Sequence, residues 1–461
     1  MRFERLGRIH FIGIAGVGMS GIAEVLLTMG FKVSGSDLRS NDTTERLKSL
    51  GAVISEGHSP GNVAGAELAV FSSAVGRENP EIVEAARIGI PVIPRGEMLA
   101  ELTRLKDSAV VSGSHGKTTV TAMISHIAHD LGLDPTVIIG GRLSSIGSTA
   151  RLGRSSLMVA EADESDRSFL LLHPSVGVIT NIDWEHVDTY PSLESMKDAY
   201  VEFANKVPFY GAVVAFGDDP NVREIMPKFR RRTITYGFHP SNEWTAAKAG
   251  GGDGESFEVF FNGKSAGLFG IPQKGTHMIL NSLASIAVSS QIGVPPGEVA
   301  RSLASFPGVD RRFQLVGRAA GVRIYDDYAH HPTEMKALFD AARSEAGNGR
   351  MVALFQPHRF TRLQKFEDDF ARVLLSSDVA VVTEVYAASE LPIPGITGEA
   401  LVNKTRKLGH GNCHFVPDVA DVAGFVAPLL REGDLVMTVG AGTITKVGPA
   451  LARLLGAENE L

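Results

Sequence analysis

Short apolar runs alternate with longer stretches of helical periodicity along most of the chain. An apolar run at residues 8–16 leads into a glycine-rich turn at 16–21, and the helical pattern of residues 22–30 ends on a glycine. A second apolar run follows at residues 31–37. A strand, a helix and a second strand in this order predict a βαβ unit, and further apolar runs continue the alternation to about residue 100.

Two more series of the same kind follow. The second opens at residue 107, and apolar strands are expected at 155–161 and 175–183, each ending in polar residues. Residues 212–270 are strand-rich, and residues 277–293 have the pattern of a long helix. The third series contains apolar runs within GVRIYDDYAHHP, MVALFQPHRF, DVAVVTEVY and DLVMTVGAGTI.

The segment FPGVDRRFQLVG has turn residues and no periodicity, so a domain boundary is predicted near residue 313. The predicted fold class is α/β, with three consecutive domains at residues 1–107, 108–312 and 313–461. The first and third domains are expected to be Rossmann-like, and the central one to be of the phosphate-loop ATPase type. Ligands of such sheets bind at the carboxyl ends of the strands.

Composition narrows the class of protein. Apolar residues make up 44% of the 461 residues and charged residues 21%, which is typical of a folded globular protein. The net charge of −7 argues against a nucleic-acid partner. A single cysteine, Cys413, excludes an internal disulfide. No apolar run approaches the roughly 18 residues that span a bilayer, and the apolar N-terminal run leads into a glycine turn instead of a cleavage site, so a cytoplasmic protein without membrane insertion is expected.

The pattern Gly16-x-Gly18-x-x-Gly21 follows the first strand. Glycines at these positions let backbone N–H groups approach a diphosphate at the start of a helix. Asp37 ends the next strand, where a carboxylate can accept hydrogen bonds from ribose hydroxyls. The alternative is a tight structural turn, and this pattern alone would favour a nicotinamide dehydrogenase.

The stretch GSHGKTT at residues 113–119 resembles the end of a phosphate-binding loop. The usual pattern places a glycine where this chain has Val111, so the loop is shorter than the common type. Lys117 can reach terminal phosphates, and the Thr118 hydroxyl can bind magnesium. A surface turn is the alternative. Glu161, in EADESD after a buried strand, is a candidate second metal ligand.

The third series carries its polar residues at two strand ends that are expected to be adjacent. A carboxylate and two imidazoles lie in the first, and His358, Arg359 and Arg362 lie in the second. Arginine binds carboxylates and phosphates through two parallel hydrogen bonds, so the set suits a zwitterionic substrate beside a triphosphate. The two arginines, spaced i, i+3, are expected on one helical face. Two surface charge clusters are the alternative.

Taken in order, these motifs resemble the Mur ligases, ATP-dependent amide-forming enzymes of peptidoglycan synthesis. The resemblance covers the whole chain and rests on nine segments: IHFIGIAGVGMSGIAEVLL, GSHGKTT, EADESDRSFL, NIDWEHVDTYPS, GVDRRFQ, DDYAHHPTE, FQPHRFTR, VYAASELPIPG and GAGTI. The family's phosphate loop is of the short type, which accounts for Val111. Within the family, the branch that adds L-alanine to UDP-N-acetylmuramate is the most similar, and the branch that recycles a murein tripeptide onto the same UDP-sugar is the alternative.

The resemblance implies a role for each motif. For the UDP-sugar it implies Gly16, Val17, Gly18, Met19, Ser20, Gly21, Asp37, Ser72 and Ser73. For ATP it implies Gly113, Ser114, His115, Gly116, Lys117, Thr118, Thr119, Asn281, Arg312 and Asp327. For Mg²⁺ it implies Thr118, Glu161 and His186, and for the amino acid Tyr328, His330, His358, Arg359 and Arg362.

The implied reaction transfers the γ-phosphoryl group of ATP to the lactyl carboxylate, and the amine of alanine then attacks the acyl phosphate. The catalytic candidates are Lys117 and Arg312 for the phosphoryl charge, with His330 or His358 for the amine. Two positions depart from the family's common pattern. Met278 stands where an asparagine is usual, and Tyr200 lies near the place of a carbamylated lysine that many members carry, so no carbamate is assigned.

Overall fold

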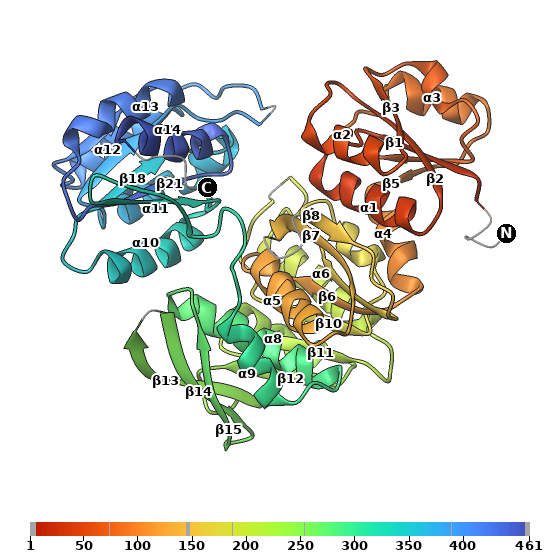
Figure 1. Cartoon of the computed structure of the whole chain (residues 1–461), viewed down its shortest axis with the longest axis horizontal. Helices are drawn as coiled ribbons and strands as arrows, with labels where there is room; N and C mark the ends of the chain where they lie inside the picture. The colour runs from red at the N-terminus through yellow and green to blue at the C-terminus, as the bar shows by residue number, and fades with distance from the viewer. Residues whose placement is uncertain are drawn as a thin grey trace. The chain divides into compact units, whose positions relative to one another are not determined.

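The computed structural model describes residues 6–72, 74–143, 148–186, 188–252, 254–388 and 390–456. The chain divides into two compact units, one of Met1–Pro272 with Ile279–Val309 and one of Gln273–Met278 with Asp310–Leu461. The described strands form three sheets in chain order, two in the first unit and one in the second (Figure 1). The predicted α/β class is therefore confirmed. None of the described helices has the length and apolar character needed to cross a membrane.

The first sheet is parallel, with strand order β3-β2-β1-β4-β5. Its strands are β1 Arg8–Ile12, β2 Lys32–Asp37, β3 Val53–Glu56, β4 Leu68–Phe71 and β5 Val92–Pro94. Its helices are α1 Val17–Thr28, α2 Asp42–Ser49, α3 Pro80–Arg87 and α4 Arg95–Arg104, with a 3₁₀ turn at Pro60–Val63. The central strands β1 and β4 are buried almost throughout, which explains why their residues are mostly apolar.

Helix α1 begins earlier than the sequence pattern predicts. Residues 16–21 were expected to form a turn, but the helix starts at Val17 and only Gly16 precedes it as the N-cap. Gly18 therefore lies in the first helical turn, where a Cβ atom would approach within 2.6 Å of the Arg95 Nη1 atom. This glycine makes room for an arginine side chain beside the start of the helix.

A buried carboxylate fastens α3 to this sheet. Glu81 is fully buried, accepts hydrogen bonds from the Ser36 hydroxyl at 2.5 Å and the Asn62 amide, and lies near the rings of His58 at 3.2 Å and His10 at 3.6 Å. Burial alone would raise the pKa of Glu81, but the hydrogen bonds with His10, Ser36 and Asn62 lower it to about 2. A folded-state pKa below the unfolded value stabilises the fold above pH 4.5, and this stabilisation is lost as the pH falls toward 2.

Glu81→Gln is accordingly expected to lower the free energy of unfolding by about 3 kcal/mol at neutral pH. The gap between wild type and variant should shrink to less than half at about pH 3, because the wild-type carboxyl is then largely protonated in the unfolded chain only. Urea unfolding of both proteins at pH 7 and pH 3 measures this difference in the free energy of unfolding. Glu84→Gln, on the same helix and paired with Arg87 at the surface, is the matched control and should change stability little. A pH-independent gap for Glu81→Gln would contradict the assignment.

The central sheet has the order β15-β14-β13-β12-β11-β10-β6-β9-β7-β8. Its strands are β6 Asp107–Ser112, β7 Thr136–Leu143, β8 Ser148–Arg151, β9 Leu157–Glu161, β10 Val176–Ile179, β11 Ala212–Phe216, β12 Thr233–Gly237, β13 Trp244–Gly252, β14 Gly254–Phe261 and β15 Lys264–Ile271. Its helices are α5 Lys117–Asp130, α6 Leu193–Lys206, α7 Pro220–Ile225, α8 Thr276–Gln291 and α9 Pro296–Ala304, with 3₁₀ turns at Ser168–Leu171 and Met226–Lys228.

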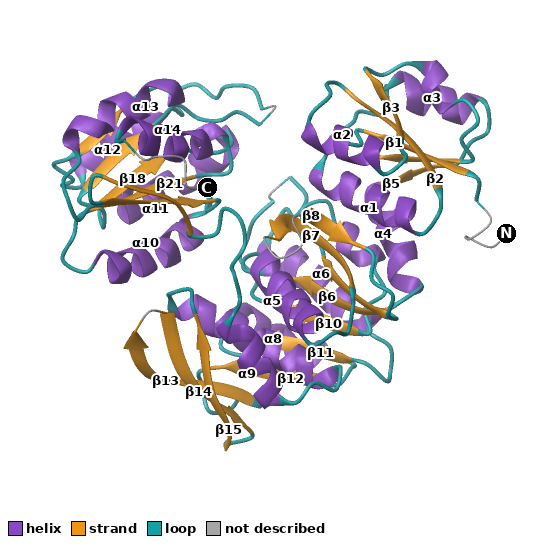
Figure 2. Ribbon diagram, in the orientation of Figure 1, coloured by secondary structure: helices purple, strands orange, loops and turns teal. Residues whose placement is uncertain are grey.

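Strand β6 lies between β9 and β10 and is parallel to both. The segment GSHGKTT follows β6, residues 180–186 follow β10, and Glu161 is the last residue of β9. All three therefore lie at the carboxyl-terminal edge of the sheet. The strand-rich region ends in the antiparallel strands β13, β14 and β15, drawn in Figure 2 as long neighbouring arrows.

The third sheet has the order β16-β17-β21-β18-β19-β20. Its strands are β16 Gln314–Ala319, β17 Val322–Asp327, β18 Met351–Phe355, β19 Val379–Val382, β20 Cys413–Phe415 and β21 Leu435–Val439. Its helices are α10 Pro332–Ala346, α11 Phe360–Leu374, α12 Gly398–Lys407, α13 Val419–Val426 and α14 Val447–Leu454, with 3₁₀ turns at Ala427–Leu429 and Thr443–Lys446.

Two expectations for this region are wrong. Strands β17 and β18 are not adjacent, because β21 lies between them: Val436 pairs with Ile324 on one side and with Val352 on the other. All three strands are parallel, so the polar residues after β17 and β18 still reach the same edge. Residues 314–317, which were expected to be irregular, begin β16, and this strand pairs antiparallel with β17.

Candidate functional site

The loop between β6 and α5 is held by the segment that follows β10. The His115 N–H donates to the Asn181 side chain at 2.8 Å, and the His115 carbonyl accepts from the Thr180 hydroxyl at 2.6 Å. The Ser114 hydroxyl accepts from the Asp183 N–H at 2.8 Å. These contacts fix the backbone of a loop that has only residues 113–116 between the strand and the helix. These hydrogen bonds therefore fix a short loop at the N-terminus of α5. Helix N-termini are common binding sites for anions.

Gly116 is the N-cap of α5 and has φ +82°, a backbone conformation that favours glycine. A Cβ atom at this position would lie 2.8 Å from the Asn281 side-chain oxygen. Asn281, on α8, therefore lies beside Gly116, and its role toward ATP stays a prediction. Met278, where the family resemblance implied an asparagine, is buried at the start of the same helix.

Lys117 begins α5 and lies at the centre of a group of carboxylates. Its ammonium donates to the Glu164 carboxylate at 2.9 Å and to the loop carbonyls of Gly113 and Ser114 at 2.6 and 3.0 Å. Burial lowers the pKa of Lys117, but the negative charges of Glu164 and Glu161 outweigh burial and raise it above the usual value. The lysine is therefore charged and folded back onto its own loop.

Oxygen ligands suitable for magnesium lie beside this lysine. The Thr118 hydroxyl donates to Glu161 Oε1 at 3.0 Å, while Glu161 Oε2 accepts from the Gly140 N–H at 2.7 Å. The Nε2 atom of His186 lies 3.2 Å from Glu164. Carboxylate and hydroxyl oxygens are the ligands that Mg²⁺ prefers. The carboxylates of Glu161 and Glu164 carry more negative charge than Lys117 neutralises, so these residues fit a divalent cation.

Glu164 was missed as a site residue. It lies in the quoted EADESD segment, and its side chain is 3% exposed between Lys117 and His186. Its carbonyl also accepts from the Tyr190 hydroxyl at 2.7 Å. The sequence shows four acidic residues in this segment without indicating which one turns inward. The mostly apolar segment that follows, residues 168–172, indicates that the chain turns into the core there. It does not indicate which of the four acidic side chains is buried.

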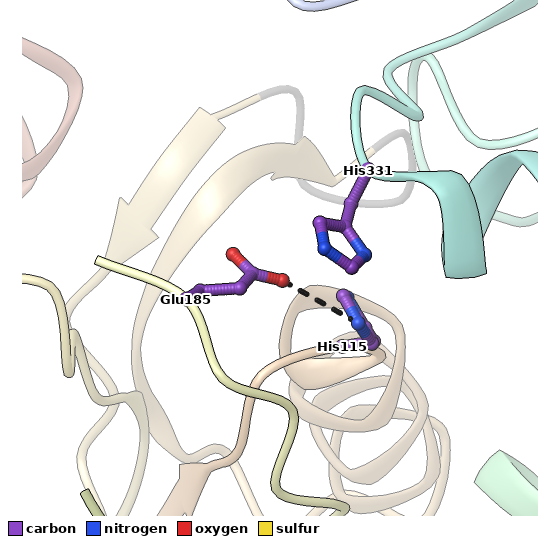
Figure 3. A group of neighbouring side chains, drawn as sticks. All are labelled: His115, Glu185 and His331. Atoms are coloured by element: carbon purple, nitrogen blue, oxygen red, sulfur yellow. Dashed lines mark ion pairs between the residues drawn. The ribbon is translucent and has the colours of Figure 1, made fainter. Parts of the chain in front are cut away.

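His115 and Glu185 point toward one another across this edge (Figure 3). The His115 Nε2 atom lies 3.4 Å from Glu185 Oε1 and 3.1 Å from Asp183 Oδ2. Glu185 is buried, and His115 is largely so.

The turn after β1 brings the first-sheet candidates together. Asp37 accepts from the Ala15 N–H at 2.8 Å, so its carboxylate supports the turn before α1. A Cβ atom at Gly13 would lie 3.3 Å from Ser72 Cβ, which places Ser72 at the same turn. Ser73 lies outside the described residues. Arg95, which the sequence analysis missed, borders Gly18 and pairs with Asp163 at 3.1 Å.

At the end of β17, the two neighbouring aspartates have different surroundings. Asp326 binds Arg311 at 3.0 Å and the Thr445 hydroxyl at 2.8 Å, and it fastens strands together. Asp327 accepts from the backbone N–H groups of Phe313 at 2.6 Å and Ala329 at 2.7 Å. Burial raises the pKa of Asp327 to about 6, although nearby Arg312 and these hydrogen bonds act in the opposite direction. Arg312 lies over the ring of Tyr328.

Aromatic rings line the same edge. The rings of Tyr328 and His330 have centroids 5.3 Å apart, those of His330 and His358 5.8 Å, and His358 stacks on Tyr386 at 5.5 Å. Burial lowers the pKa of His330 to about 3 and that of His358 to about 4, so both imidazoles are neutral at physiological pH. Tyr386 belongs to the quoted VYAASELPIPG motif but was not chosen as a site residue.

Arg359 and Arg362 do not share a helical face, contrary to expectation. Helix α11 begins at Phe360, and Arg359 precedes it as the N-cap with φ +70°. Its N–H donates to the Tyr386 carbonyl at 2.9 Å, which fixes this turn, and its side chain is 46% exposed near Glu390. Arg362 lies in the first turn of α11, with Nη1 3.3 Å from the His358 Nδ1 atom. Of these two arginines, Arg362 is the one that contacts the ring cluster.

Comparisons with known proteins cover nearly the whole chain. Residues 8–107 match the family described as "Mur ligase family, catalytic domain", residues 111–289 the "Mur ligase middle domain", and residues 311–442 the "Mur ligase, glutamate ligase domain". These ranges correspond to the three sheets.

Curated relatives match this chain over nearly its whole length and theirs. The chain is 48% identical over 460 residues to a UDP-N-acetylmuramate–L-alanine ligase of Solibacter usitatus, covering 99% of this chain and 97% of the relative. It is 46% identical to the enzyme of that name from a Geobacter species, covering 99% and 100%.

A solved structure of UDP-N-acetylmuramate-alanine ligase from Thermotoga maritima has a TM-score of 0.83 at 30% identity, covering 97% of this chain and 98% of that one. A murein peptide ligase from Psychrobacter arcticus has a TM-score of 0.72 at 22% identity, covering 99% and 100%, and shares the fold. The ordered motifs, the three sheets and these matches together show that the chain belongs to the Mur ligase family.

Proposed function

We propose that this chain is an ATP-dependent ligase that joins L-alanine to the lactyl carboxylate of UDP-N-acetylmuramate. The observation that carries the proposal is the full-length identity of 46–48% to relatives that are named for this reaction. The buried lysine and its carboxylates at the end of β6 support the ATP-dependent step. The domain divisions that we propose, 1–107, 108–312 and 313–461, assign one substrate to each sheet.

In the first step, the lactyl carboxylate attacks the γ-phosphorus of ATP and ADP leaves, which gives an acyl phosphate. Lys117 moves from Glu164 and its loop carbonyls to the phosphates, and Arg312 supplies a second positive charge; both stabilise the negative charge that develops. The backbone of residues 113–116 cradles the phosphates, Thr119 and Asn281 lie beside them, and Asp327 accepts from the ATP ribose.

Thr118, Glu161 and His186 would hold Mg²⁺, with Glu164 beside them. When bound, this ion supplies positive charge to the phosphate oxygens. The Thr118 hydroxyl and the Glu161 carboxylate already lie 3.0 Å apart, so both would be available to hold the ion.

In the second step, the amine of alanine attacks the acyl carbon, phosphate leaves, and a proton is released from the amine. His330 and His358, neutral at physiological pH, can accept hydrogen bonds from the amine and orient its lone pair. Because their pKa values are so low, orientation suits them better than storage of the released proton. Arg362 binds the alanine carboxylate, and Tyr328 and Arg359 complete the wall of this site.

The UDP-sugar is assigned to the first sheet. The N-terminus of α1, at residues 16–21, presents backbone N–H groups to its diphosphate. Ser72 borders this turn, and Asp37, which supports it through Ala15, lies at the end of the neighbouring strand.

Product mass spectrometry tests the proposal. The chain is incubated with UDP-N-acetylmuramate, ATP, Mg²⁺ and an equimolar mixture of L-alanine and L-alanyl-γ-D-glutamyl-diaminopimelate. We expect the UDP-sugar conjugate of alanine, with one phosphate released per amide bond. A conjugate of the tripeptide alone would replace the proposal with the recycling reaction, and phosphate release that does not depend on the UDP-sugar would contradict a ligase.

A further inference from the structure

Two exposed aromatic side chains lie at the amino-terminal end of the central sheet. Phe209 is 90% exposed and Tyr210 72%, in the loop between α6 and β11. Their rings meet edge to face, with centroids 5.3 Å apart and an interplanar angle of 86°. Large apolar side chains at this level of exposure are unfavourable in water, and two together point to a contact surface.

A run of three arginines lies in the loop next to the one that carries these rings. Arg230, Arg231 and Arg232 precede β12, and Val213 of β11 donates its N–H to the Arg232 carbonyl at 2.8 Å, so the two loops are neighbours. The Arg231 guanidinium also donates to the Val207 carbonyl, which fastens the arginine run to the aromatic loop. Within the described residues, none of these three arginines forms an ion pair with a carboxylate. We call Phe209, Tyr210 and these arginines the aromatic–arginine patch.

The patch lies away from the catalytic edge. Strands β6, β10, β11 and β12 are parallel, and the nucleotide loop follows the carboxyl end of β6, whereas the patch precedes β11 and β12. A partner bound here would leave the catalytic edge of this sheet open. The catalytic proposal uses none of the patch residues.

We propose that the aromatic–arginine patch docks the enzyme on an anionic phospholipid surface. Exposed aromatic rings insert at the boundary between headgroups and acyl chains, and neighbouring arginines are attracted to anionic headgroups. The chain has a net charge of −7, so a polyanion that wraps around it would meet repulsion, while a flat membrane contacts only the protruding loops. The rings protrude from a loop and contact each other, unlike aromatic platforms along a groove on which nucleic-acid bases stack.

Vesicle sedimentation of the full chain tests this inference. The probes are vesicles of equal parts phosphatidylglycerol and phosphatidylcholine, and vesicles of phosphatidylcholine alone. We expect binding to the anionic vesicles that falls with added salt, and none to the neutral ones. Phe209→Ser/Tyr210→Ser should weaken the partition coefficient at least about tenfold, and Arg230→Ser/Arg232→Ser roughly thirtyfold at low salt.

A matched control removes one exposed cation and one exposed apolar side chain from β15. Lys264→Ser/Leu268→Ser should bind vesicles like wild type, because Leu268 is 64% exposed but lies outside the patch. Thermal melting and ligase turnover without vesicles should be unchanged in all three variants. Equal binding by the wild type and both patch variants would overturn the inference. So would tighter binding to a single-stranded oligonucleotide than to the anionic vesicles.

Discussion

Replacing Lys117 with alanine should abolish ATP-dependent ligation, with a loss of at least about a hundredfold in turnover. No side chain of the loop at residues 113–116 carries a permanent positive charge, so Lys117, which directly follows the loop, is the one proposed to reach the terminal phosphates. The substitution should also lower stability, because it leaves the buried Glu164 carboxylate without the ammonium at 2.9 Å. Breaking a buried ion pair from one side costs on the order of 3 kcal/mol. Phosphate release and thermal melting measure the two effects.

A double variant separates these effects. Lys117→Ala/Glu164→Gln removes the buried negative charge as well, so its melting temperature should return toward that of wild type while ligation stays absent. Near-normal phosphate release in either variant would contradict the role of Lys117. An inactive single variant whose melting temperature is unchanged would contradict the stabilising pair but not the catalytic role.

The second large effect is expected in alanine recognition. Arg362→Lys should raise the KM for L-alanine about thirtyfold, because the loss of a two-point contact with a carboxylate costs about 2 kcal/mol and lysine lacks the planar fork. The KM for UDP-N-acetylmuramate should stay nearly unchanged, because this substrate is assigned to the first sheet. Steady-state kinetics with each substrate varied in turn provides the measurement.

Two arginines of the same region serve as comparisons. Arg372→Lys, on the same helix and paired with Asp369 at the surface, should leave both KM values unchanged. Arg359→Lys should have a smaller effect than Arg362→Lys, since Arg359 precedes the helix and is half exposed. If Arg359→Lys and Arg362→Lys both spare alanine and raise the KM for the UDP-sugar, the site map of the third domain is wrong.

Local patterns were sufficient for much of the fold. The alternation of apolar runs and helical stretches predicted β1, α1 and β2, although α1 starts at Val17 instead of after Gly21. Glycines weaken a helix without forbidding one, and the packing of Arg95 beside Gly18 is not visible in local sequence. The polar residues after β6, β9 and β10 were also correctly expected at strand ends.

Features that depend on distant pairing escaped prediction. The insertion of β21 between β17 and β18 pairs Val436 with Ile324, 112 positions earlier, and with Val352, 84 positions earlier. The choice of Glu164 among the acids of EADESD depends on Lys117 and His186, which lie on other strand ends. Arg359 has a positive φ and donates its N–H to the distant Tyr386 carbonyl, so it lies outside helix α11. The i, i+3 spacing to Arg362 therefore gave a wrong prediction of a shared helical face.

The position of β21 has a consequence for synthesis on the ribosome. Strands β16 to β20 leave the ribosome before β21, yet β21 pairs with both β17 and β18 near the middle of the sheet. Domains assemble as their residues emerge at about 5–20 residues per second, so the first two sheets can form while this one still lacks a central strand. Nascent chains that stop before residue 435 would expose the apolar flanks of β17 and β18 to chaperones and proteases. The proposed amino-acid site therefore cannot be completed until β21 has been translated, although all its proposed side chains were made earlier.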